Sequence, residues 1–117
     1  MMTKKLLGGS ATPTIAANAG VGTTPTISIT GTDTAGKIIL TTGTTPTAAA
    51  DIATLTFNAA YSAAPYPVLT PGNAATTALG AATGVYPTPS TTTLKLTAGA
   101  TSLAASTQYV WYYNVIG

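Results

Sequence analysis

The sequence of 117 residues contains no cysteine, histidine, arginine or glutamate. These residue types supply most general bases, nucleophile pairs and metal ligands in enzymes, so we expect no enzyme and no cofactor. Without cysteine there is also no disulfide framework, and stability must come from packing or from oligomerisation. Asp33 and Asp51 could form a catalytic carboxylate pair, but each stands beside a predicted strand, where aspartate commonly serves as a turn or cap residue. Lys37 and Lys95 lie at outward strand positions, which do not suit a Schiff-base lysine.

Charge is scarce as well. Charged residues make up 5% of the chain, whereas about 25% is usual for a soluble domain. The four lysines and two aspartates form no basic patch, so nucleic-acid binding is not expected. Hydrophobic residues reach 45% and the mean hydropathy is +0.37. Such a chain should fold and then bury part of its surface against a permanent partner.

Long apolar runs are also missing. A secretory signal needs roughly 7–15 consecutive apolar residues and a membrane span about 20, whereas here only Leu6 and Leu7 follow Lys4 and Lys5. We therefore expect a protein made in the cytoplasm, with no membrane partner. Residues 1–21 are mostly small and cannot form a core, which predicts an extended N-terminal arm, or alternatively an unordered terminus. The residues of this arm that could contact a neighbour are Lys4, Lys5, Leu6, Leu7 and Ile15.

Threonine is abundant, at 27 of 117 residues, and its branched side chain favours β-strands. Alternating apolar and polar residues predict a hairpin formed by Thr26–Thr30 and Lys37–Thr41. Further strands are predicted at 54–58, at 92–97, in the extended segment 85–89, and around Val68 and Leu69, where flanking prolines indicate a sheet edge. Residues 73–84 fit a helical turn or a loop equally well. About six to eight short strands, separated by turn signals, predict an antiparallel β-sandwich or jelly roll over residues 22–117.

One five-residue sequence occurs twice in the chain. Gly22–Thr26 and Gly43–Thr47 have the same sequence, Gly-Thr-Thr-Pro-Thr. Glycine opens turns and proline lacks a donor for a β-ladder, so each copy is expected to mark a strand boundary or a sheet edge.

The C-terminal segment 107–117 is the most distinctive part of the sequence, because it holds four of the eight aromatic residues. If it is a strand, both of its faces are largely apolar. Such a strand should be central, with a core on one side and a second buried surface on the other. We interpret Tyr109, Trp111, Tyr112 and Tyr113 as core residues or as residues of a subunit interface.

Several motifs, taken as a set, resemble a small β-domain of tailed-phage structural proteins. They are Ile29–Gly43, Ala53–Phe57 with Tyr61 and Pro65, Val68–Pro71, and Gln108–Gly117. The domain is known from decoration proteins, head-fibre proteins and C-terminal modules of longer fibres. The resemblance implies a β-sandwich that assembles as a homotrimer on the virion surface. Because the similarity spans residues 22–117 and no long shaft is present, it favours a capsid decoration protein bound to the major capsid protein.

Two other functions fit parts of the sequence. A fibre tip that recognises a cell-surface glycan would use exposed aromatic residues, and Tyr61, Tyr66 and Tyr86 lie among prolines in predicted loops. An ice-binding surface would use flat, threonine-rich strands.

Overall fold

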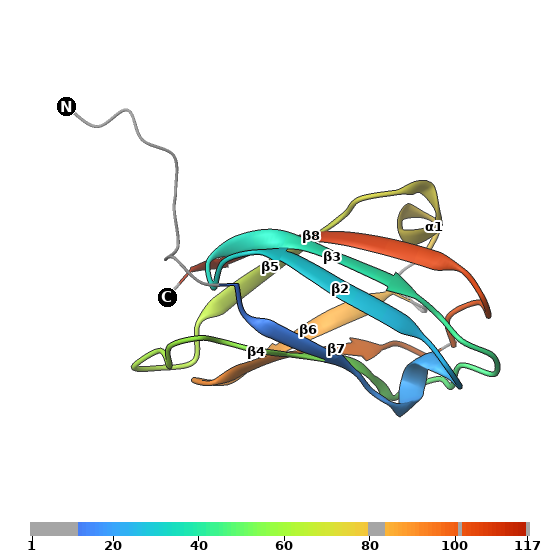
Figure 1. The fold of residues 1–117 in the computed structure, drawn as a ribbon, viewed down its shortest axis with the longest axis horizontal. Coiled ribbons are helices and arrows are strands. Elements are labelled where there is room, and N and C mark those ends of the chain that lie inside the picture. Colours follow the sequence, from blue (N-terminus) through green and yellow to red (C-terminus); the bar gives the residue numbers. More distant parts are fainter. Residues whose placement is uncertain (1–11, 80–83, 101, 117) are drawn as a thin grey trace.

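The computed structural model describes residues 12–79, 84–100 and 102–116, and it shows an all-β protein of two packed layers (Figure 1). Each layer is an antiparallel sheet of four strands. One sheet has the strand order β1-β4-β7-β6 and the other has the order β2-β3-β8-β5. The strands are β1 (Thr14–Ala17), β2 (Thr26–Gly31), β3 (Ala35–Thr41), β4 (Asp51–Thr56), β5 (Tyr66–Pro71), β6 (Val85–Pro89), β7 (Thr93–Ala98) and β8 (Gln108–Ile116).

This architecture confirms the predicted antiparallel sandwich. The β2–β3 hairpin pairs Thr26 with Thr41 and Thr30 with Lys37, as the alternating pattern indicated. β5 and β6 lie at sheet edges, where their prolines interrupt no ladder. A jelly-roll strand order is not confirmed.

The core lies between the sheets and consists of the inward side chains of both layers. Ile38 and Leu40 from one sheet face Leu55, Leu94 and Leu96 from the other, and all five are fully buried. Burying a side chain of this kind stabilises a fold by about 1.5–3 kcal/mol. The alternation of apolar and polar residues that predicted these strands therefore also identifies the residues that hold the sheets together.

The C-terminal strand is central, as predicted. β8 pairs with β3 on one side and with β5 on the other. Tyr109, Trp111 and Tyr113 are buried on its inner face, and the rings of Tyr109 and Trp111 stack at 6.0 Å between centroids. Tyr112 points to the opposite face and is 48% exposed, so it is not a core residue.

The proposed start of the sandwich at residue 22 is too late. β1 pairs with β4, with Ile15 opposite Leu55, and Ile15 packs against the core. Val21 follows in a short 3-10 helix, Ala19–Val21, and is fully buried. Ile15 is therefore part of the sandwich rather than a free anchor of an arm. The other residues predicted for the arm, Lys4, Lys5, Leu6 and Leu7, lie outside the described residues.

The repeated Gly-Thr-Thr-Pro-Thr segments lie side by side, joined by an isolated antiparallel bridge between Thr23 and Thr44. Thr24 and Thr45 both have positive φ, at 56° and 55°, so the two copies also share a backbone conformation. The repeated segments therefore mark strand boundaries, as predicted.

In the segment 73–84, which the sequence left undecided, the described residues 73–79 and 84 include one helical turn, α1 (Ala74–Thr77). Asn73 caps it by accepting a hydrogen bond from the Thr76 amide at 3.0 Å. The cap explains why a segment with two threonines starts a helix there.

Candidate interaction surface

Four of the five large exposed apolar residues in the described part of the chain gather on the outer face of β5 and β8. Tyr66, Val68, Tyr112 and Ile116 are 76%, 51%, 48% and 59% exposed. Tyr66 stands directly opposite Ile116, and Val68 stands opposite Asn114, diagonally between Tyr112 and Ile116. Neighbours of this kind across antiparallel strands are within contact range of large side chains. These four residues form one continuous surface, which we call the β5–β8 face.

Strand geometry explains why these apolar side chains are exposed. Side chains alternate across a strand, so the same register that buries Trp111 and Tyr113 must turn Tyr112 and Ile116 outward. A soluble sheet normally places polar residues at such positions. Lys37, which stands opposite Tyr112 on β3, is the charged residue next to the face.

One end of the outer face of β8 is covered by the chain itself. Val110 is 7% exposed, and its amide donates a hydrogen bond to the Thr76 hydroxyl of α1 at 2.9 Å. The Gly72 amide donates to the Val110 carbonyl at 2.7 Å, and a Cβ at Gly72 would come within 2.5 Å of Val110 Cγ1. Glycine at 72 therefore allows the α1 segment to close over Val110, and the β5–β8 face begins where this cover ends.

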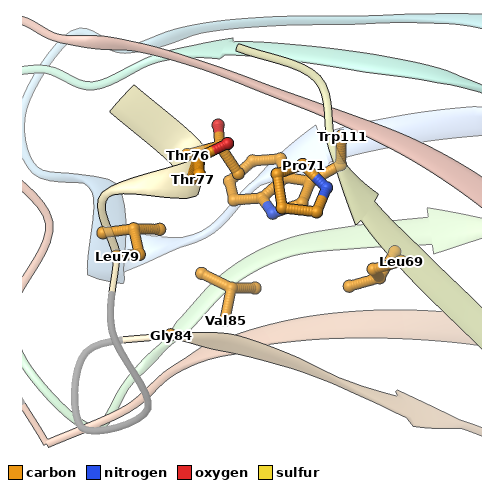
Figure 2. A pocket seen from close by; sticks show the side chains of 8 residues that line it. All are labelled: Leu69, Pro71, Thr76, Thr77, Leu79, Gly84, Val85 and Trp111. Carbon is orange, nitrogen blue, oxygen red and sulfur yellow. The ribbon is translucent and has the colours of Figure 1, made fainter. Parts of the chain in front are cut away.

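A small cavity opens beneath α1, between β5 and β6 (Figure 2). It has a volume of about 200 Å³, and its walls include Leu69, Pro71, Val85 and Trp111. The Thr76 hydroxyl at its margin bonds to the Asn73 side chain and to the Val110 amide. The hydrogen bonds of this hydroxyl are therefore made within the fold. The wall residues named above offer mainly apolar contacts to any molecule in the cavity.

Asp33 has a structural environment. Its carboxylate is buried and accepts hydrogen bonds from the amides of Asn58 and Ala59, at 2.9 and 3.1 Å. Its own carbonyl accepts the Tyr61 hydroxyl at 3.1 Å. Asp33 therefore fastens the β2–β3 turn to the loop that follows β4, rather than closing only its own turn.

Two tyrosine hydroxyls join this cluster. The Tyr113 hydroxyl donates to the Thr32 carbonyl at 2.6 Å. Burial, with the negative charge of Asp33 and then Tyr61 as smaller causes, raises the pKa of Tyr113 to about 12. Burial and the charge of Asp33 also raise the pKa of Tyr61. Both hydroxyls are therefore held in their neutral, donating form, which suits a structural role.

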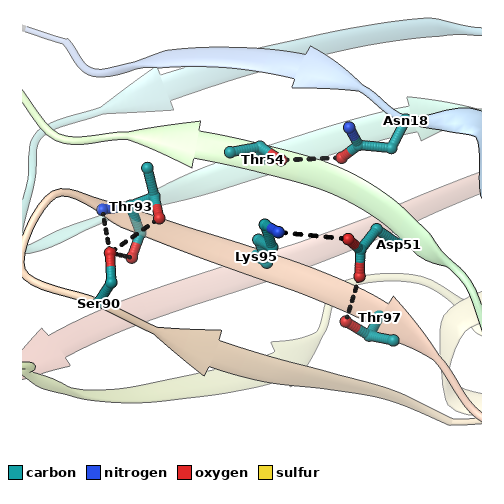
Figure 3. A network of polar contacts seen from close by, with 7 residues as sticks. All are labelled: Asn18, Asp51, Thr54, Ser90, Thr93, Lys95 and Thr97. Carbon is teal, nitrogen blue, oxygen red and sulfur yellow. Dashed lines mark hydrogen bonds and ion pairs between the residues drawn. The ribbon is translucent and has the colours of Figure 1, made fainter.

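Asp51 lies at the other end of β4 and forms a surface contact. Its carboxylate lies 3.4 Å from Lys95 Nζ and accepts the Thr97 hydroxyl at 3.1 Å (Figure 3). Asp33 reaches residues after the end of β4, whereas Asp51 begins the strand, so about 20 Å of strand separates them at roughly 3.3 Å per residue. A glycosidase pair requires carboxylates about 5–9.5 Å apart. The two aspartates are not brought together.

The described residues contain no group of three or more potential metal ligands. Over the same ranges, no helix has the length and apolar character needed to cross a membrane. Comparisons of the chain with protein-family models, with curated proteins and with solved structures found no match.

Of the four aromatic residues singled out in the sequence, only Tyr112 reaches the candidate surface. Tyr66, Val68 and Ile116 were not predicted to belong to it. In β8, where both faces carry large apolar residues, alternation gives two sets of side chains but does not say which set faces inward. It also does not say that β5 lies beside β8. That pairing joins segments about forty residues apart and was the missing information.

Proposed function

We propose that the chain is a virion structural protein, a homo-oligomeric decoration protein on the capsid surface of a tailed phage. It would be made in the host cytoplasm, have the major capsid protein as its partner, and carry out no catalysis. The observation that carries the proposal is the β5–β8 face, a surface on which four exposed apolar residues surround Asn114 and Thr70, on a fold with its own core. The resemblance of the sequence motifs to phage structural proteins supplies the identity of the partner.

The β5–β8 face suits attachment to a shell because it is apolar and sparsely charged. Docking would bury Tyr66, Val68, Tyr112 and Ile116, and apolar burial contributes about 25 cal/mol per Å² before the cost of association. A protein docked across a junction adds contact area between neighbouring shell subunits and so resists pressure from within. Lys4, Lys5, Leu6 and Leu7 would add further contacts to the shell, and the homotrimer implied by the resemblance stays a prediction.

The proposal is tested by measuring occupancy on phage particles. Tyr112→Thr with Ile116→Thr removes half of the β5–β8 face without touching the core. We expect the variant to fold normally and to decorate particles with at least tenfold lower affinity, as judged by titration and cryo-electron microscopy. Tyr86→Thr is the matched control, because Tyr86 is equally exposed, at 52%, but lies on β6 in the other sheet. Full occupancy by the double variant would contradict the proposal.

A glycan-binding fibre tip is the second candidate, and the exposure of Tyr66 and Tyr86 favours it. Tyr61 drops out of this set, because its hydroxyl is bonded to Asp33 and its ring packs edge-on against Phe57 at 4.9 Å. A glycan-array signal that is lost in Tyr66→Ala or Tyr86→Ala, with no binding to particles, would favour this function over decoration.

A further inference from the structure

The four edge strands of the sandwich differ in how well they are protected against pairing with another strand. An edge strand presents unpaired amides and carbonyls, and proteins commonly guard such edges with proline, charge or short length. β5 and β6 form the edges on one flank, and β1 and β2 form those on the other.

The flank of β5 and β6 is closed by proline. The Gly72 amide donates to Val110, so even-numbered positions of β5 face β8 and odd-numbered positions face outward. Pro67 and Pro71 occupy odd positions and remove two outward donors. On β6, the Ser90 amide donates to Thr93, and the same alternation places Pro87 and Pro89 on the free side.

On the opposite flank, Pro25 stands just before β2, and the strand itself has no such protection. The Thr32 amide donates to the Ala35 carbonyl, so even-numbered residues of β2 face β3, and the amides and carbonyls of Ile27 and Ile29 face outward. β2 spans Thr26–Gly31 and contains no proline and no charged residue. β1 is shorter, at four residues. β2 is therefore the edge that remains open to another strand.

The sequence of β2 is suited to pairing with itself. Residues Thr26–Thr30 read Thr-Ile-Ser-Ile-Thr and are the same in both directions. In an antiparallel pair centred on Ser28, each residue therefore stands opposite one of its own kind. Ile27 and Ile29 of each copy would exchange backbone hydrogen bonds with Ile29 and Ile27 of the other. Threonine would face threonine on the outer side, which is a favourable cross-strand pair.

The partial burial of the β2 isoleucines also favours pairing of β2 with a second copy. Ile27 and Ile29 pack against the core but remain partly exposed at the open flank. A second β2 strand would cover them with its own isoleucines and continue the core across the contact. Thr26, Ser28 and Thr30 are exposed on the outer face, and the charged residue beside them, Lys37, stands opposite Thr30 on β3 rather than on the edge strand itself.

From these observations we infer that two copies of this chain associate through β2, antiparallel and centred on Ser28, to form a continuous eight-stranded sheet. The contact is two-fold, so it produces a dimer, or a hexamer if a three-fold contact exists elsewhere. The inference goes beyond the proposed function, because it does not require a shell and leaves the β5–β8 face free for one.

Disulfide trapping tests this register directly, since the chain has no cysteine of its own. At the two-fold axis the two Ser28 residues form a non-hydrogen-bonded pair with Cα atoms about 4.5 Å apart, within the range that a disulfide spans. Ser28→Cys should therefore cross-link into a dimer under mild oxidation. Thr26→Cys is the matched control, because residue 26 would face residue 30 of the other copy. It should cross-link with Thr30→Cys in a mixture but not with itself.

Charge at the axis gives a second, independent test by light scattering. Ser28→Lys and Ser28→Asp should each weaken self-association at least tenfold, and mixing the two variants should restore a one-to-one pair. Thr70→Lys, an exposed position on β5, should leave association unchanged. The inference is overturned by a monomeric wild type at micromolar concentration, by equal cross-linking of Ser28→Cys and Thr26→Cys, or by dissociation in Thr70→Lys alone. These outcomes concern isolated protein, so they are separable from occupancy on particles.

Discussion

On the inner face of β8, Tyr109, Trp111 and Tyr113 are almost completely buried, whereas on the outer face Tyr112 is 48% and Ile116 59% exposed. Both faces of this nine-residue strand carry large apolar residues, and the outer face also carries Gln108 and Asn114. The difference lies in what stands opposite each face: a second sheet on the inside, and on the outside, among the residues that the structure describes, only the α1 segment, which covers Val110. The presence of a large apolar side chain therefore does not by itself separate the core from the exposed surface here, and substitutions on either face test the difference between them.

The largest effect is expected from Trp111→Ala on the inner face. Trp111 is buried against Tyr109, so truncation leaves a large void, and losses of about 3–5 kcal/mol are typical for such changes. Chemical denaturation of the variant should show this loss in the free energy of unfolding. Tyr112→Ala, at the next position, should cost far less. A loss below about 1 kcal/mol at Trp111 would show that the inner face is not the main core.

An intermediate, pH-dependent effect is expected at Tyr113. Its pKa is raised to about 12, above the ordinary value near 10 that the unfolded chain retains. The neutral hydroxyl therefore stabilises the fold fully below about pH 10, and this contribution is lost as the pH rises towards 12. Tyr113→Phe should lower stability at neutral pH by about 1 kcal/mol, through loss of the bond to Thr32, and should flatten the decline above pH 10.

The measurement for Tyr113 is the thermal midpoint between pH 8 and 12. The pKa of Tyr61 is also raised by burial, and this acts in wild type and variant alike, so only the difference between their curves reports Tyr113. Tyr112→Phe removes an exposed hydroxyl from the outer face and serves as the control. Parallel curves for wild type and Tyr113→Phe would show that the hydroxyl does not contribute to the alkaline transition.

The sandwich could be predicted from the sequence because each strand carries its own signal. Alternation predicted the strands that carry the buried residues Ile38, Leu40, Leu94 and Leu96, and apolar residues on both faces predicted that β8 is central. These are local properties, readable within five to nine residues. The segment 14–21 was assigned to an arm because its residues are small, but β4 provides a partner on which Ile15 and Val21 pack.

The interaction surfaces could not be predicted in the same way, because they depend on pairing between distant segments. The β5–β8 face exists only because Tyr66 stands opposite Ile116. The open edge of β2 depends on the strand order, which places β2 outermost in its sheet. The palindromic order of residues Thr26–Thr30 is visible in the sequence. It suggests self-pairing only once β2 is known to lie at a sheet edge.

The smallest effect is expected from Val68→Thr on the outer face of β5. The two side chains have nearly the same shape and both favour strands, and Val68 is already 51% exposed. Surface changes of this kind alter the free energy of unfolding by less than about 0.5 kcal/mol. Leu69→Thr, one residue along, should cost clearly more, because Leu69 packs against the core. If denaturation instead shows similar losses at both positions, and the loss at Val68 grows with protein concentration, then the β5–β8 face is covered by another copy in solution. In that case the face would serve self-association, and attachment to a shell would need a different surface.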